Sequence, residues 1–183
     1  AKHFLLYLLS RYLGYNFENY FNIVDVDLGF PNYLHLHRKK VPEFLNSLIV
    51  LDYDVQIKAA EAQLSYVESN TKNILFLPDD VESGMFKLLK DPIHYASFEN
   101  IITDIRMPYD ICFKDWTENV YNAVEYKRWF AYMEETLGGV EKMYDFWCGR
   151  NENSARKFVI DFINAYNLIA EKMGYDYMMG ILE

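Results

Sequence analysis

Six aspartate and histidine residues in the first third of the chain have the types and spacing of a metal site. They are Asp25, Asp27, His35, His37, Asp52 and Asp54. Mixed Asp and His ligands suit Mn, Zn or Fe, whereas carboxylates alone suit Mg. A divalent ion held by such ligands can activate water for hydrolysis. The six residues therefore define a candidate site for a metal-dependent hydrolase or nuclease.

These residues can meet only if the segments that carry them are paired strands. Apolar and polar residues alternate at 23–28, at 34–37 and at 51–57. This period of two is typical of strands with one buried face. Residues 29–32 (Gly-Phe-Pro-Asn) have the composition of a turn. The pattern predicts an antiparallel hairpin followed by a third strand.

The register of the predicted hairpin follows from its apolar residues. Opposite residues of an antiparallel pair share a face, so the apolar faces of the two strands must coincide. Asp27 then lies opposite His35, and Asp25 lies opposite His37. Opposite side chains are about 5 Å apart at Cβ, close enough to share a ligand. The alternative, which we favour, is a solvent-facing surface, because a one-sided antiparallel sheet shows alternating polar residues to water.

Aromatic residues are concentrated between positions 107 and 147. Five of them are candidates for a partner-binding surface: Trp116, Tyr126, Trp129, Tyr132 and Trp147. The simplest interpretation is a hydrophobic core. An exposed fraction would form a protein-binding face, since interfaces favour Tyr and Trp, or a platform on which bases stack. The acidic charge of the chain favours a protein over a nucleic acid.

Charge and composition exclude several classes of protein. The chain has 183 residues, of which 18 are basic and 27 acidic, so its net charge is −9. Nucleic-acid binding needs Lys and Arg to displace counterions, and the one basic run, 38–40, is short. No apolar run approaches the roughly 20 residues of a membrane span. The isolated Cys112 and Cys148 fit a reducing compartment, so we expect a cytoplasmic protein. No glycine-rich phosphate-binding motif is present, so no cofactor is expected apart from the alternative metal.

Helical periodicity marks most of the other elements. Amphipathic or helix-rich segments are predicted at 3–14, 58–69, 81–90, 97–105 and 154–173, with a short strand at 73–77. Residues 109–116 alternate weakly, with Tyr109, Ile111 and Phe113 on one side. The helix at 154–173 has the longest apolar face, and Gly174 stands where a C-terminal glycine belongs. No linker or repeat divides the chain. We therefore predict a single α+β domain over residues 1–183, an antiparallel sheet covered on one face by helices that include 154–173.

Residues 105–116 (IRMPYDICFKDW) resemble the core of certain uncharacterised phage and prophage proteins. Those proteins carry a proline- and aromatic-rich stretch on a central strand. Asp110 stands where the second proline is usual, and Asp115 where a glutamate is usual. The resemblance implies a viral origin, hence the host cytoplasm, and a strand at 109–116. It implies no activity and no site residues.

Two classes of function follow from these observations. The first is a non-enzymatic protein-interaction module, phage-encoded by the resemblance, that acts through an acidic and aromatic surface on a protein partner or on a second copy. The alternative is the metal-dependent hydrolase or nuclease. We favour the first, because no catalytic motif in the sequence is intact. Whether the protein is an enzyme stays open at this stage.

Overall fold

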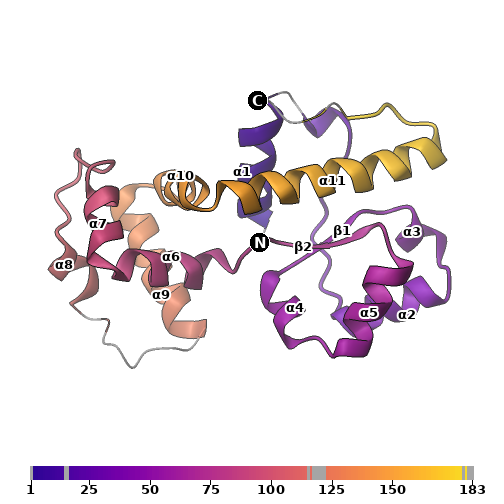
Figure 1. Cartoon of the computed structure of the whole chain (residues 1–183), viewed down its shortest axis with the longest axis horizontal. Coiled ribbons are helices and arrows are strands. Elements are labelled where there is room, and N and C mark those ends of the chain that lie inside the picture. The colour runs from indigo at the N-terminus through magenta and orange to yellow at the C-terminus, as the bar shows by residue number, and fades with distance from the viewer. Residues whose placement is uncertain (1, 15–16, 115, 117–122, 179, 181–183) are drawn as a thin grey trace. The chain divides into compact units, whose positions relative to one another are not determined.

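The computed structural model describes residues 2–14, 17–114, 116, 123–178 and 180. Helices make up 67% of the structure. Within the described ranges the only strands are β1 (Ile49–Leu51) and β2 (Ile74–Phe76). The two strands lie side by side (Figure 1). They are parallel, with Ile49 opposite Ile74 and Leu51 opposite Phe76. The predicted α+β fold with an antiparallel sheet packed by helices is therefore wrong.

The chain divides into two compact units. Unit 1 comprises Ala1–Asp79 and Asn153–Glu183, and unit 2 comprises Asp80–Glu152. Besides the two strands, unit 1 holds α1 (Lys2–Leu13), the 3-10 helix η1 (Phe17–Asn19), α2 (Phe30–Arg38), α3 (Pro42–Leu45), α4 (Tyr53–Lys58), α5 (Glu61–Asn70) and nearly all of α11 (Glu152–Met173). Unit 2 holds α6 (Val81–Lys90), α7 (Pro92–Glu99), α8 (Tyr109–Phe113), α9 (Ala123–Leu137) and α10 (Glu141–Arg150). The single domain expected over 1–183 stays a prediction.

The segment predicted as the second strand, 34–37, lies in helix α2. Pro31 occupies its first turn, a position where proline suits a helix. Phe30, Tyr33 and Leu34 are buried together, and their spacing is that of one helical face. The alternation at 34–37 spans only four residues, which is too short to distinguish a strand from one face of a helix.

The third predicted strand, 51–57, is also mostly helical. β1 ends at Leu51, Asp52 takes the N-cap position, and α4 begins at Tyr53. The Lys58 ammonium donates to the Asp54 carboxylate at 2.6 Å across one helical turn, a pairing that supports the helix. Helices α4 and α5 then form the crossover that two parallel strands require.

Residues 109–113 form helix α8 rather than the strand implied by the phage resemblance. Pro108 precedes the helix in an extended conformation, which a proline favours. Cys112 and Phe113 are buried, whereas Ile111 is 48% exposed. Tyr109, Cys112 and Phe113 share a helical face, so the alternation of Tyr109, Ile111 and Phe113 does not describe the structure.

The core of unit 1 contains two groups of packed side chains. One cluster consists of buried residues from α2, α5 and the two strands: Phe30, Tyr33, Leu34, Ile49, Val67 and Ile74. Elsewhere in the unit, the Phe21 ring lies 5.5 Å from that of Phe162 and 5.9 Å from that of Tyr166, both on the apolar face of α11. Helix α11 ends as predicted at Gly174, whose φ of 72° suits glycine.

The core of unit 2 is aromatic. Helix α6 packs against α7, α9 and α10. Its Phe86 side chain is 1% exposed. The centroid of the Phe86 ring lies 5.2 Å from that of Trp129 and 5.7 Å from that of Phe113. Among the described helices, none is long and apolar enough to cross a membrane.

Candidate functional site

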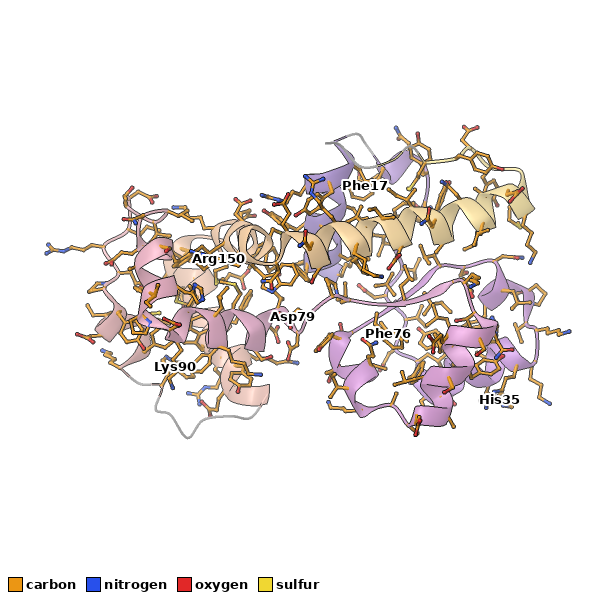
Figure 2. All side chains as sticks on the ribbon, viewed as in Figure 1. Phe17, His35, Phe76, Asp79, Lys90 and Arg150 are labelled. Carbon is orange, nitrogen blue, oxygen red and sulfur yellow. The ribbon has the colours of Figure 1, made fainter. Side chains whose placement is uncertain are left out.

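The predicted hairpin that was to carry the metal site is absent. Asp25 and Asp27 lie in a segment with neither helix nor strand, whereas His35 and His37 lie on α2. Residues two apart on a helix point in nearly opposite directions. Accordingly, His35 is exposed on the surface of α2 (Figure 2). His37 is half-buried. The expected pairs Asp27–His35 and Asp25–His37 depended on the hairpin register, and that register is wrong.

The two remaining candidate ligands belong to the start of α4. Asp52 is exposed at the N-cap position, and Asp54 is paired with Lys58. In the part of the chain that the structure describes, no three His, Cys, Asp or Glu side chains are placed to hold a metal ion together. The metal-site hypothesis required the predicted hairpin to bring these side chains together, and the structure does not contain that hairpin.

His37 instead has a place in the packing of unit 1. Its Nδ1 atom lies 2.9 Å from the Tyr66 hydroxyl oxygen, and the two rings meet edge to face with centroids 5.8 Å apart. Burial lowers the pKa of His37, and a hydrogen bond with the Asn73 side chain partly opposes this. The imidazole is therefore neutral at neutral pH. No feature of the sequence around His37 indicated the tyrosine, which is 29 residues away.

The five aromatic candidates are divided between the core and the surface of unit 2. Trp129, Trp147 and Tyr126 are buried, whereas Trp116 and Tyr132 are half-buried. The indole of Trp129 is fully enclosed and contacts Phe86 and Phe113. A buried ring offers no area to a partner, so the three buried side chains contribute to stability in this structure. Residues 117–122, which lie between Trp116 and α9, are outside the described part of the chain.

The Val24–Asp27 segment combines exposed apolar side chains with exposed acidic ones. Val24 is 73% exposed and Val26 is 57% exposed, and both neighbouring aspartates, Asp25 and Asp27, are exposed as well. Leu28, which follows, packs against the core cluster of α2, α5 and the strands. The alternation at 23–28, which predicted a half-buried strand, thus belongs to a surface segment whose valines and aspartates are exposed to solvent.

The backbone of this segment is largely free to bind another chain. The carbonyl of Val26 accepts a hydrogen bond from the Leu28 amide at 3.0 Å and one from the Tyr33 hydroxyl at 3.3 Å. For the amides of Val24 and Asp25, the described residues provide no backbone partner. Unpaired amides next to β-branched side chains are what a strand from another molecule requires.

Electrostatic contacts hold the segment only weakly. Lys2 Nζ lies 3.3 Å from the Asp25 carboxylate, but the two side chains are 40% and 75% exposed. Exposed pairs of this kind contribute about 0–1 kcal/mol. Burial, and then the charge of Asp27, raise the pKa of the Tyr33 phenol. Two acidic side chains thus alternate with the two exposed valines.

Comparison with known proteins gives no family for the chain. No family model matches it, and neither the curated proteins nor the solved structures contain a match.

Proposed function

We propose that this chain is a non-enzymatic protein-interaction module that binds a partner through the Val24–Asp27 segment. The observation that carries the proposal is the exposure of Val24 and Val26, at 73% and 57%. Fully burying a side chain of this type stabilises a complex by about 1.5–3 kcal/mol. Burying both valines against a partner would therefore make a favourable apolar contribution to the binding free energy.

A single exposed valine is ordinary on a protein surface. This segment differs because two valines alternate with two aspartates, and because the described residues provide no backbone partner for the amides of Val24 and Asp25. An extended peptide can bind an exposed backbone by main-chain hydrogen bonds, with alternate side chains setting specificity. Val24–Asp27 is neither helix nor strand in the free chain, and we infer that it becomes a strand when it pairs with such a peptide.

The charges of the segment indicate the chemistry of its partner. If two copies paired antiparallel through this segment, the aspartates of one copy would face those of the other. Like charges directly opposite each other destabilise a strand pair. A partner whose basic residues alternate with apolar ones would place positive charges beside the aspartates and apolar side chains beside the valines. The net charge of −9 adds long-range attraction for the same partner.

The test uses a synthetic peptide of alternating lysine and valine, acetyl-KVKVKVK-amide, with a fluorescent label. Fluorescence anisotropy measures its dissociation constant for the full chain. The variant Val24→Ser/Val26→Ser keeps every charge and removes only the apolar anchor. We expect it to bind at least about tenfold more weakly, a loss of about 1.4 kcal/mol.

The matched control is Ile93→Ser, which removes an apolar side chain that is 77% exposed on α7. We expect this variant to bind the peptide like the parent chain. Equal affinity for the parent and for the double valine variant would show that the peptide responds only to net charge, and the proposal would then be wrong. A phage origin remains a prediction from the resemblance at 105–116.

A further inference from the structure

A shallow pocket of about 170 Å³ opens on unit 1, between the C-terminal half of α11, the end of α2 and the turn before β2. Its polar lining consists of His37, Lys72, Asn73 and Lys172. Neither Asp nor Glu is among the residues that line it, although the chain has 27 acidic and 18 basic residues. The pocket is thus locally basic in an acidic protein.

Lys172 is held at the rim by a hydrogen bond. Its ammonium donates to the Asn46 side-chain oxygen at 2.7 Å, and Asn46 is the residue that ends α3. An ammonium has three N–H donors, so two remain for a ligand. No carboxylate from the described residues pairs with Lys172.

Lys72 supplies the second positive charge. It is exposed in the turn between α5 and β2, and it too lacks a carboxylate partner within the described ranges. Two ammonium groups that line one pocket repel each other, and an anion between them relieves that repulsion. The charge of the pocket therefore favours an anionic ligand.

Asn73 and His37 form a polar wall without adding charge. The Asn73 amide is buried and donates to the Phe44 and Ser47 carbonyls at 2.6 and 2.9 Å, so its orientation is fixed. His37 bonds to Tyr66 and is neutral at neutral pH, because burial lowers its pKa. The two lysines are then the groups that attract the anion.

The rest of the lining is aliphatic. It is formed by Leu45 and by Ala165, Leu168 and Ile169 of α11. Leu168 is 52% exposed, so a ligand that covered it would remove apolar surface from water. A bare inorganic anion would leave this aliphatic lining uncovered. The lining therefore suits a ligand with a charged end and a short hydrocarbon body.

We propose that this pocket binds a small aliphatic carboxylate, with its carboxylate between Lys72 and Lys172 and its chain against Leu168 on α11. The site is independent of the Val24–Asp27 segment. The volume of about 170 Å³ limits the ligand to a short chain.

The experiment titrates hexanoate into the full-length, isotope-labelled chain and follows amide shifts by NMR. Hexanol and inorganic phosphate are titrated in parallel. We expect saturable shifts at Leu168, Ile169 and Asn73 with hexanoate. Hexanol lacks the charge and phosphate lacks the hydrocarbon, so each should bind at least about tenfold more weakly. Equal binding of hexanol or of phosphate would overturn the proposal, as would the absence of shifts at α11.

Two variants and a control then locate the ligand. Lys172→Gln and Lys72→Gln should each weaken hexanoate binding by about tenfold, the effect of losing one charged contact. Lys39→Gln removes the same charge from an exposed residue that does not line the pocket, and should have no such effect. All three side chains are exposed, so folding should be retained, which circular dichroism checks. An equal loss in Lys39→Gln would show that binding depends on net charge alone.

Discussion

Phe113 stacks on Trp129 in unit 2, with ring centroids 5.6 Å apart and planes inclined by 15°. Phe86 meets the same indole edge to face at 5.2 Å. This three-ring arrangement joins α6, α8 and α9 and encloses Trp129 completely. It explains why much of the aromatic region predicted as a binding surface is core.

Replacing Phe86 with alanine should destabilise unit 2 strongly. The side chain is 1% exposed, and removing a buried phenylalanine costs about 3–5 kcal/mol. All three tryptophans of the chain, Trp116, Trp129 and Trp147, lie in unit 2, so tryptophan fluorescence during thermal unfolding reports on this unit. Ile93→Ala, on the exposed side of α7, should change stability by less than about 0.5 kcal/mol. Similar melting curves for the two variants would contradict the proposed core.

Both thiols should be inert while the chain is folded. Cys112 and Cys148 are buried and form no disulfide, and burial raises the pKa of Cys112 to about 12 although hydrogen bonds with Tyr95 and Trp129 oppose the rise. The reactive form of cysteine is the thiolate, which is scarce at such a pKa. We expect no reaction with a disulfide reagent at pH 8, and two equivalents of reaction in denaturant. Rapid labelling of one thiol in the folded chain would count against this burial.

Alkaline pH should unfold unit 2. Burial, and then the carboxylates of Glu134, Glu82 and Glu141, raise the pKa of Tyr144 from its ordinary value near 10 to about 12. Between these values the unfolded chain loses the phenolic proton and the folded chain keeps it, so stability falls as the pH rises from 10 to 12. Far-UV circular dichroism measures the midpoint. The variant Tyr144→Phe cannot ionise and should unfold at higher pH, and a midpoint at lower pH would argue against the buried phenol.

The aspartates of the Val24–Asp27 segment should keep the chain from associating with itself. Charged residues beside β-branched ones protect strand-like segments from pairing. The variant Asp25→Asn/Asp27→Asn removes the repulsion and leaves both valines, so we expect concentration-dependent dimers in light scattering coupled to size exclusion. Adding Val24→Ser/Val26→Ser to this variant should restore the parent behaviour. A purely monomeric Asn variant would show that these charges do not control association.

The sequence predicted the long helices better than the short segments, for a physical reason. From Phe158 to Ala170 the apolar residues repeat at helical spacing over several turns, so α11 was expected at 154–173, and α1 and α6 lie close to their predicted ranges. The alternations at 34–37 and 51–57 cover too few residues to separate a strand from one side of a helix. The predicted Asp–His pairs were wrong for the same reason, because their register was derived from those strands.

The features to which we assign a proposed function depend on contacts that no local pattern shows. Val24 and Val26 are exposed because the chain from 22 to 27 has no strand beside it, a property of the whole unit. The basic pocket joins Lys72 and Lys172, which are 100 residues apart in sequence. The sequence shows that both residues are lysines. It does not show that they line the same pocket.

Hydrogen exchange at the amides of Val24 and Asp25 tests the central claim most directly. Mass spectrometry would follow residues 22–28 in the full chain, alone and with the alternating lysine–valine peptide. We predict rapid exchange in the free chain, because these amides lack a described backbone partner, and marked slowing on binding as they donate to the peptide. The valine-to-serine double variant should show little slowing. Unchanged exchange at 22–28 under conditions where the peptide is bound would contradict the proposal that this segment is the docking site.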